Sequence, residues 1–372
     1  MNGTPALRVL RLAKRFGGAR AIEDATFEVK DREYLCVLGP TGSGKTTLLR
    51  LIAGIIKPDE GEIFIDDEGM NEVPAEYRNA VYVPQTYALF PHMTVLENVM
   101  FGPMAREEPA EEARVEAMRV LRLVRLDNRA DSLPNELSGG MQQRVALARG
   151  LATGYRLLLL DEPLGALDAR LRIELRDDLR RLAKESGLTV IHVTHDQEEA
   201  MTVADRILVL RAGRVQQHGT PFHVYNRPEN LFVANFVGRT NFLEGIVEAR
   251  NRDRSTVRLR ENLSVDVADT SHEDEEDIIV AVREERTLLT GDDPGEGRNV
   301  LDGEVTQISF LGAYIRLGVR LRNGDSVSSL MPTDIVLGRF RVGDRVWVSF
   351  HAGSALVYDY PTLGLRHELE AY

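Results

Sequence analysis

The segment at residues 39–47, GPTGSGKTT, has the composition of a phosphate-binding loop. It satisfies G-x-x-x-x-G-K-[ST] between an apolar run and a helix-forming stretch, which is the setting that this pattern requires. Its glycines let backbone N–H groups approach phosphate oxygens that a Cβ would obstruct. The Lys45 ammonium can reach the β- and γ-phosphates of a nucleotide, and the Thr46 hydroxyl can bind Mg²⁺. The expected nucleotide-binding residues are Gly39, Pro40, Thr41, Gly42, Ser43, Gly44, Lys45, Thr46 and Thr47.

Two adjacent carboxylates end the apolar run at 156–163, RLLLLDEP. An apolar strand that ends in a carboxylate is how phosphate-loop proteins place a second Mg²⁺ contact, which makes Asp161 the candidate. Glu162 stands where the chain leaves the strand and is the candidate general base for a water that attacks the γ-phosphate. Such a base typically contributes about 10²–10⁴ in rate.

Gln85 and His195 follow two further apolar runs. The Gln85 amide is a candidate contact for Mg²⁺ or for the attacking water, although a glutamine in a loop is by itself an ordinary residue. His195 ends the run TVIHVTHD, at the edge where an α/β sheet binds its ligand, and we expect it to touch the γ-phosphate. We interpret His192, inside the same run, as structural.

The segment LSGGMQQR at 137–144 has the features of an anion-binding helix start. Ser138 is a natural N-cap, and Gly139 and Gly140 let backbone N–H groups face outward. The segment itself contains no base, metal ligand or activated nucleophile.

The elements that must position these residues alternate between short apolar runs and helical periods up to about residue 236. This alternation predicts an α/β domain with a mostly parallel sheet. Leucines recur on one face after residue 168 and predict an amphipathic helix that ends before Gly187. The expected buried strands are Tyr34–Leu38, Ala80–Val83, 156–160, 189–193 and 206–210.

Two stretches depart from the alternation. Helical segments, including 111–125 and 141–151, replace strands at about 87–150, which we interpret as a helical subdomain. Beyond Gly238, short β-like runs separated by turn signals predict an all-β domain. The expected domains are therefore 1–236, a linker at 237–242, and a β-rich domain at 243–372.

An internal echo in the β-rich part joins LEGIVE at 243–248 with LDGEVT at 301–306. This similarity suggests two similar β units, and coincidence is the alternative because the match covers only six residues.

The composition limits which partners the protein can bind and in which cellular compartment we expect it. The 372 residues carry a net charge of −12 without a basic stripe, so we expect no nucleic-acid partner. The single cysteine, Cys36, allows no internal disulfide, which fits a reducing cytoplasm. We expect no signal peptide, and no window approaches the roughly 20 apolar residues that cross a bilayer. Membrane attachment would require another component.

The motifs stand in a specific order: the phosphate loop at 39–47, Gln85, LSGG at 137–140, LLLLDEP at 157–163, GALD at 165–168 and His195. Over roughly residues 5–236 this ordered set resembles the ATPase subunit of ABC transporters. The remainder resembles, more loosely, the C-terminal regulatory domain of importer ATPases of the maltose, polyamine and iron type. The resemblance implies an α/β P-loop NTPase domain with a helical subdomain, followed by an all-β, OB-like or TOBE-like domain.

The resemblance also implies a site that two copies of the chain share. Ser138, Gly139 and Gly140 would bind the γ-phosphate of the ATP held by the other copy, and Asp168 would lie across the same interface. Phe16 would stack on adenine, although a core or strand phenylalanine is equally consistent with the residues alone.

The implied function is substrate import. A homodimer would close head to tail on two ATP molecules with Mg²⁺ and switch two membrane permease subunits, which would dock on the segment at 86–102. The permease would hold the chain at the cytoplasmic face of the inner membrane. An extracytoplasmic solute-binding protein would deliver the substrate without touching this chain. The sequence VPAEYR at 73–78 and the sequence at 87–102 most resemble polyamine importers, which favours spermidine or putrescine as the substrate. Sugar and iron importers share much of these two sequences.

A soluble ABC-type ATPase that acts on ribosomes or DNA is the alternative. Such proteins typically carry two ATPase cassettes or a coiled-coil insertion. This sequence has one phosphate loop and no sustained heptads between Gln85 and Ser138. A regulatory module with a silent ATPase would lack Glu162 or His195, and both are present.

Three positions depart from the family pattern. Met141 stands in place of a usual glutamine, Gly165 in place of a usual serine, and VREE at 282–285 where R-P-E is usual. Met141 leaves the backbone N–H groups of Gly139 and Gly140 unaffected, so the expected phosphate contacts remain. The VREE change leaves any substrate or regulatory role of the β-rich domain without support from the sequence.

Overall fold

The computed structural model describes residues 5–165, 169–295 and 299–370. These residues form two compact units, divided along the chain between Val224 and Tyr225. The candidate site residues within the described ranges all belong to the first unit.

A six-stranded sheet forms the centre of the first unit, in the order β10-β9-β3-β8-β7-β6. Strands β9, β3, β8, β7 and β6 run parallel, and β10 pairs antiparallel with β9. The five strands expected from apolar runs are confirmed to within one residue. Strands β3, β7 and β8 are buried along their full lengths, which explains their continuous apolar sequence. The bounds are β3 Tyr34–Leu38, β6 Ala80–Val83, β7 Leu157–Asp161, β8 Thr189–Thr194, β9 Arg206–Arg211 and β10 Arg214–Gly219.

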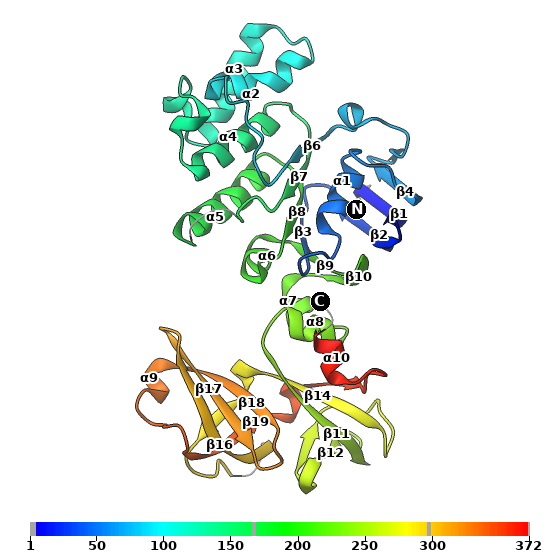
Figure 1. Ribbon diagram of the computed structural model, residues 1–372, viewed down its shortest axis with the longest axis vertical. Coiled ribbons are helices and arrows are strands. Elements are labelled where there is room, and N and C mark those ends of the chain that lie inside the picture. Colours follow the sequence, from blue (N-terminus) through cyan, green and yellow to red (C-terminus); the bar gives the residue numbers. More distant parts are fainter. Residues whose placement is uncertain (1–4, 166–168, 296–298, 371–372) are drawn as a thin grey trace. The chain divides into compact units, whose positions relative to one another are not determined.

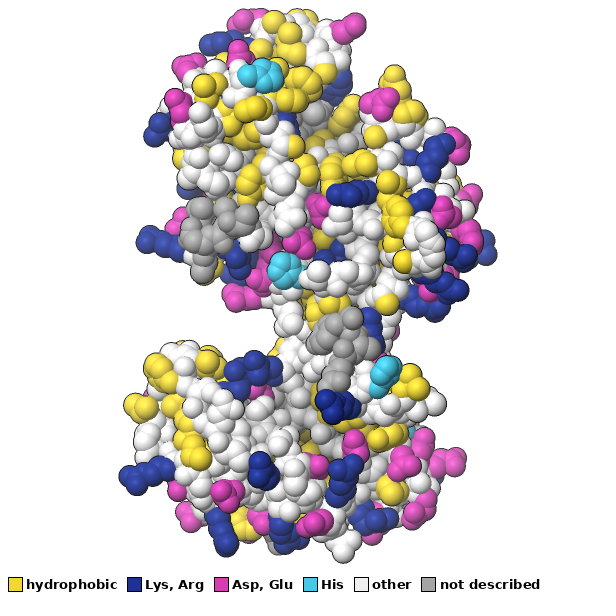
Figure 2. Space-filling model, in the orientation of Figure 1, with side chains coloured by type: hydrophobic (Ala, Val, Ile, Leu, Met, Phe, Trp, Pro, Cys, Tyr) yellow, Lys and Arg dark blue, Asp and Glu magenta, His cyan; other side chains and the backbone are white. Residues whose placement is uncertain are grey.

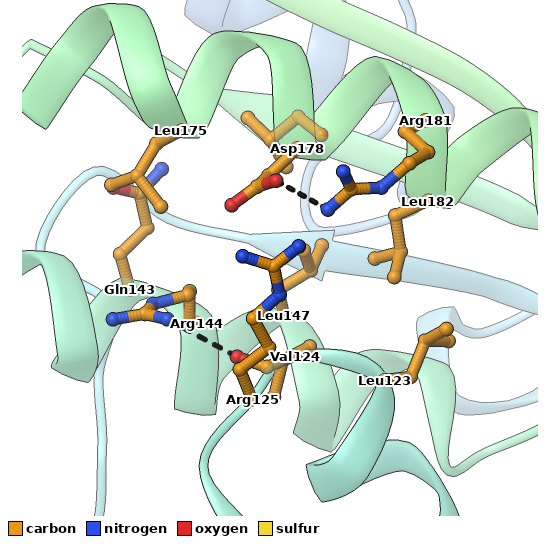
Figure 3. Close-up of a pocket in the computed structure, with 11 residues that line it drawn as sticks. Leu123, Val124, Arg125, Gln143, Arg144, Leu147, Leu175, Asp178, Arg181 and Leu182 are labelled. Carbon is orange, nitrogen blue, oxygen red and sulfur yellow. Dashed lines mark hydrogen bonds and ion pairs between the residues drawn. The ribbon is translucent and has the colours of Figure 1, made fainter.

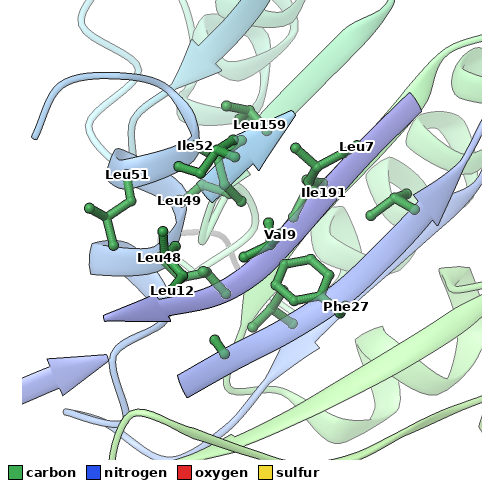
Figure 4. Packing of buried hydrophobic residues seen from close by; sticks show 14 of the residues in the cluster. Leu7, Val9, Leu12, Phe27, Leu48, Leu49, Leu51, Ile52, Leu159 and Ile191 are labelled. Carbon is green, nitrogen blue, oxygen red and sulfur yellow. The ribbon is translucent and has the colours of Figure 1, made fainter. Parts of the chain in front are cut away.

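A second, antiparallel sheet in this unit, in the order β2-β1-β4-β5, was not among the expected elements. Its strands alternate buried and exposed residues, so they lack the continuous apolar runs on which the strand prediction rested. Helix α1, Lys45–Ile52, contributes to the hydrophobic cluster that joins the two sheets (Figure 4). The strands are β1 Pro5–Phe16, β2 Ala19–Lys30, β4 Glu60–Ile65 and β5 Glu68–Gly69. The cluster includes Leu7, Val9, Leu12, Phe27, Leu48, Leu49, Leu51, Ile52, Leu159 and Ile191.

Helices fill the chain between β6 and β7 and gather at one end of the first unit (Figure 1). They are α2 Val95–Ala105, α3 Ala110–Leu123 and α4 Gly139–Leu151, with 3-10 turns at Ala75–Tyr77 before β6 and at Asp127–Arg129 and Pro134–Glu136 after it. A reciprocal pair of hydrogen bonds between Thr94 and Glu97 caps the start of α2. The remaining helices are α5 Ala169–Glu185, α6 Gln197–Val203 and α7 Pro221–Asn226, which spans the division between the units.

Two five-stranded antiparallel sheets form the second unit and share one hydrophobic cluster. Their orders are β13-β12-β11-β14-β20 and β15-β19-β16-β17-β18. The strands are β11 Thr240–Arg250, β12 Ser255–Leu259, β13 Ser264–Val267, β14 Asp277–Arg283, β15 Leu288–Thr290, β16 Asn299–Phe310, β17 Tyr314–Leu321, β18 Ser326–Pro332, β19 Arg345–Phe350 and β20 Ala355–Asp359. The helices are α8 Leu231–Phe236, α9 Thr333–Val336 and α10 Leu365–Glu370, with 3-10 turns at Arg260–Asn262, Glu284–Arg286 and Ala352–Ser354.

The internal echo marks two equivalent hairpins. Gly245 of β11 pairs with Leu259 of β12, and Gly303 of β16 pairs with Leu321 of β17. A Cβ at Gly245 would lie 2.5 Å from Val257, and one at Gly303 would lie 2.6 Å from Val319. The sequence VRLR occurs at 257–260, where β12 ends, and again at 319–322, where β17 ends. The suggested similarity of the two β units is therefore confirmed.

Arg283 explains why the second unit begins before the expected linker at 237–242. Its guanidinium donates to the carbonyl oxygens of Tyr225, Ala234 and Gly238 and to the Thr240 hydroxyl. The segment at 225–240 is therefore tied to β14, and β11 already begins at Thr240. The division of the structure thus differs from the expected boundary at 236.

Charge and hydropathy of the described residues give two further observations. On the face shown in Figure 2, Lys and Arg side chains are interspersed with Asp and Glu over both units. Among the described helices, none combines the length and apolar character needed to cross a bilayer.

Truncating Ile52 to alanine tests the core between the two sheets of the first unit. Ile52 is 0% exposed, so Ile52→Ala should lower the free energy of unfolding by about 2–5 kcal/mol. The matched control Ile173→Ala makes the same change on α5, where the side chain is 51% exposed, and should stay within about 0.5 kcal/mol. Urea unfolding followed by circular dichroism measures both, and equal losses would contradict the assigned core.

Candidate nucleotide site at the carboxyl edge of the sheet

Parallel pairing brings four segments of the chain to one edge of the central sheet. The phosphate loop follows β3, His195 follows β8, and Gln85 follows β6. Asp161 is the last residue of β7, and Glu162 comes directly after it. These strands are neighbours in the order β3-β8-β7-β6 and all run in the same direction. Their carboxyl ends therefore open onto the edge where α/β sheets bind ligands.

Close packing fixes the conformation of the phosphate loop. A Cβ at Gly39 would lie 2.3 Å from the Leu210 carbonyl oxygen. Gly44 has φ +104°, and a Cβ there would lie 2.3 Å from the Ala21 carbonyl oxygen. The Ser43 hydroxyl is buried and has no hydrogen-bond partner among the described residues. The loop thus holds an unsatisfied buried hydroxyl, which a bound phosphate group could satisfy.

Lys45 folds back over the loop. Its side-chain nitrogen donates to the carbonyl oxygens of Gly39 at 2.8 Å and Pro40 at 2.9 Å. Burial lowers the pKa of the Lys45 ammonium, while the nearby Glu162 and Asp161 carboxylates act in the opposite direction. The ammonium is therefore held at the loop by neutral acceptors and two carboxylates.

Asp161 joins the end of β7 to the loop and to β6. Thr46 Oγ1 donates to Asp161 Oδ1 at 2.9 Å, and Tyr82 Oη donates to Asp161 Oδ2 at 2.8 Å. The aspartate is only 4% exposed, so both carboxylate oxygens meet a protein donor where water has little access.

The Glu162 carboxylate contacts the two other polar side chains at this edge, Gln85 and His195. Gln85 Nε2 donates to Glu162 Oε2 at 3.2 Å, and His195 Nδ1 lies 3.3 Å from Glu162 Oε1. The backbone of Glu162 has φ +46°, an uncommon conformation for a residue with a Cβ. Its N–H donates to the Val193 carbonyl at 3.0 Å, which ties this turn to β8.

The start of α4 has the expected cap. Ser138 is exposed and its hydroxyl accepts from the Met141 N–H at 3.4 Å. The N–H groups of Gly139 and Gly140 stand in the first turn, where helices leave donors without an internal partner. Within the described residues no hydrogen bond joins Ser138 to the phosphate loop, and α4 packs against α2, α3 and β6.

Comparisons with known proteins agree with this geometry. Residues 22–165 match the ABC transporter family and residues 280–357 match the TOBE domain. The chain is 41% identical over 360 residues to the spermidine/putrescine import ATP-binding protein PotA of Rubrobacter xylanophilus, covering 96% of this chain and 94% of the relative. It is 39% identical over 364 residues to the protein of the same name from Pasteurella multocida, covering 96% and 98%. The chain belongs to the import ATP-binding subunits of ABC transporters.

Solved structures place the importer subunit in the same fold. A bacterial ABC transporter cassette described as dimeric is 33% identical with a TM-score of 0.52, covering 58% of this chain and 98% of that chain. CbiO1 of Clostridium perfringens, part of an ABC transporter complex, is 30% identical with a TM-score of 0.56, covering 60% and 91%. The importer subunit is an ATPase that binds ATP, with an ABC-type P-loop fold followed by an all-β TOBE domain.

Two residues expected in the importer site lie apart from the cluster or outside the described chain. Phe16 ends β1, is 51% exposed, and has the Lys14 ammonium 5.6 Å from its ring centre. Asp168 falls outside the described residues. At Gly165 a Cβ would lie 3.7 Å from Glu162 Oε2, so the serine usual in this family would fit.

Sequence reasoning missed Tyr82 at this edge. The expected strand Ala80–Val83 precedes Gln85, but nothing in its sequence indicates that the Tyr82 hydroxyl reaches Asp161. Strand register is the missing information, because Tyr82 pairs with Leu159, two residues before Asp161 on the neighbouring strand. A tyrosine in a strand next to a strand that ends in a carboxylate is the signal that could have found it.

A small apolar pocket of the importer subunit lies elsewhere, between α4 and α5 (Figure 3). Its volume of about 20 Å³ is enough for a single water molecule. At its rim Arg144 donates to the Val124 carbonyl at 3.3 Å, and Arg181 pairs with Asp178. The pocket is too small for a nucleotide, so the candidate site remains at the strand ends.

Replacing Lys45 with methionine tests the buried ammonium. The folded pKa of Lys45 is lowered, so between that pKa and the ordinary value of about 10.4 the unfolded chain binds more protons, and stability rises with pH. In Lys45→Met this rise should be smaller, and Mg-ATP should stabilise the variant less than the wild type. Urea unfolding at several alkaline pH values measures both. The matched control is Lys57→Met, which removes an exposed ammonium, and an unchanged slope in Lys45→Met would contradict the assignment.

Proposed function

We propose that this importer subunit drives uptake of a polyamine, spermidine or putrescine, by hydrolysing Mg-ATP between two copies of the chain. The observation that carries the proposal is the set of side chains at the carboxyl edge, where Lys45, Thr46, Asp161 and Glu162 meet around one loop. The polyamine assignment rests on relatives named for spermidine and putrescine import that align over 96% of the chain.

Thr46 and Asp161 are the residues that would hold Mg²⁺. Their oxygen atoms lie 2.9 Å apart, and hydroxyl and carboxylate oxygens are the ligands that Mg²⁺ prefers. The metal would neutralise charge on the phosphate oxygens of ATP. Gln85 would complete this environment from the end of β6.

Glu162 is the proposed general base. It takes a proton from a water molecule as the water oxygen bonds to the γ-phosphorus and the bond from that phosphorus to the bridging oxygen of ADP breaks. Gln85 and His195 contact one oxygen each of the Glu162 carboxylate, which supports a role in orienting it. Gln85 would contact Mg²⁺ or the attacking water, and His195 would touch the γ-phosphate. Lys45 and the backbone of residues 39–47 bind the β- and γ-phosphates.

The second half of the site comes from a second copy. Ser138, Gly139 and Gly140 offer a hydroxyl and helix-start N–H groups that suit the γ-phosphate of the partner's ATP. Support comes from the structural relative described as dimeric. Asp168 at the same interface and Phe16 on adenine complete the proposal.

Coupling to transport follows from closure. ATP contacts both copies only in the closed dimer, so its binding shifts the population toward that state. The closure would be transmitted to two permease subunits through the segment at 86–102. Phe101 in this segment is 43% exposed, and Met104, which lies just beyond it, is 45% exposed. The subunit would then sit peripherally at the cytoplasmic face of the membrane, and a solute-binding protein would deliver the polyamine outside. Full-length similarity to import proteins favours this assembly over a ribosome- or DNA-associated ATPase.

Glu162→Gln tests the base. The variant should bind Mg-ATP and form a stable dimer while turnover falls by about 10²–10⁴. Phosphate release and size-exclusion chromatography with ATP measure the two effects. Glu198→Gln, an exposed change on α6, is the matched control. Near-normal turnover in Glu162→Gln would contradict the assignment.

A mixing experiment tests the shared site. Ser138→Arg and Glu162→Gln should each be inactive as homodimers, whereas a hybrid has one site in which every residue is native. Mixed in equal amounts before ATP is added, they should recover about one quarter of wild-type ATPase if sites turn over independently. A mixture no more active than the mean of the separate variants would oppose site sharing.

A further inference from the structure

We propose that Tyr82 is a positioning residue for the magnesium site: its hydroxyl holds the Asp161 carboxylate so that Oδ1 stays directed at Thr46. The inference rests on the proposed function, since it concerns the metal of Mg-ATP. It assigns no contact between Tyr82 and nucleotide. It predicts instead that the affinity for the metal depends on a phenol group one strand away from its ligand.

The position of Tyr82 follows from the strand register. Strand β6 is parallel to β7, and Tyr82 pairs with Leu159. Alternate residues of a strand share one face, so Leu157, Leu159 and Asp161 point to the same side of β7. The two leucines belong to the core cluster, and the Tyr82 ring packs against that cluster. The ring is therefore anchored in the core, and its hydroxyl extends past Leu159 to Asp161 Oδ2 at 2.8 Å.

The hydrogen bonds around Asp161 give the tyrosine hydroxyl a defined task. An ionised carboxylate only accepts, and each oxygen of Asp161 has one protein donor: Thr46 on Oδ1 and Tyr82 on Oδ2. Without the phenol, Oδ2 would be a buried acceptor lacking its donor, and the carboxylate could turn about its own axis. Such a turn would take Oδ1 away from Thr46.

The Tyr82 phenol is half-buried beside Asp161. Burial raises the pKa of the Tyr82 phenol, and its hydrogen bond to Asp161 acts in the same direction while Arg50 opposes it. The phenol is the donor in its hydrogen bond to Asp161, because a carboxylate oxygen only accepts.

Partners that orient a metal ligand typically change metal affinity by about 10- to 100-fold when removed. Tyr82→Phe removes one oxygen and leaves the packed ring in place. The concentration of Mg²⁺ needed for half-maximal binding of a non-hydrolysable ATP analogue should rise about tenfold or more. Binding of the same analogue in EDTA should stay within about twofold of the wild type, because no phosphate contact is lost.

The experiment compares wild type, Tyr82→Phe and Tyr77→Phe in the full chain. Tyr77 is 70% exposed in a 3-10 turn before β6, so Tyr77→Phe makes the same chemical change without touching Asp161 and should match the wild type. Analogue binding is followed in EDTA and through a Mg²⁺ titration. The electron paramagnetic resonance spectrum of Mn²⁺ in the analogue complex reports on the metal environment independently of turnover.

A double-mutant cycle separates positioning from general damage. In the Asp161→Asn background, adding Tyr82→Phe should cause no further loss of metal affinity, because the carboxylate to be positioned is gone. An unchanged Mg²⁺ requirement in Tyr82→Phe would overturn the inference. So would an equal loss of binding in EDTA, which would indicate a structural role. Wild-type chain that binds the analogue without any Mg²⁺ dependence would instead overturn the proposed magnesium site.

Discussion

The parallel pairing of β3, β8, β7 and β6 is the constraint on which the candidate site depends. Side chains that are far apart in the sequence meet at one edge because these strands run in the same direction and their carboxyl ends are aligned. Asp161 pairs with Val193, and Leu38 pairs with Thr194, so the chain leaves β7, β8 and β3 at nearly the same level. A slip of one residue in β7 would turn Asp161 to the opposite face of the sheet, away from Thr46.

The polar groups at this edge form hydrogen bonds with one another. Lys45 bonds to loop carbonyls, Thr46 to Asp161, and Gln85 to Glu162. Binding a phosphate group therefore exchanges existing hydrogen bonds for new ones, and the net gain is smaller than a count of final contacts suggests. Ser43 is the exception, because its buried hydroxyl lacks a partner among the described residues.

Much of this arrangement could be predicted from the sequence because strong local patterns encode it. Continuous apolar runs indicated the central strands, and the spacing of Gly39, Lys45 and Thr46 indicated the phosphate loop. The antiparallel sheet that contains β1, β2 and β4 was not predicted, because its strands alternate polar and apolar residues and lack continuous apolar runs. The contact of Tyr82 with Asp161 could not be predicted because it depends on the register between neighbouring strands, which is a tertiary property. The expected boundary at 236 differs because Arg283, distant in sequence, ties the segment at 225–240 to β14.

The backbone of Glu162 has a thermodynamic consequence for the whole subunit. A glutamate at φ +46° occupies a region that glycine or asparagine tolerates better, which typically costs about 1 kcal/mol or more. The turn therefore holds a residue suited to chemistry at the expense of local conformational energy. Proteins often give up stability at the positions that carry their activity. A glycine at 162 would adopt this backbone conformation without that cost, but it would remove the carboxylate.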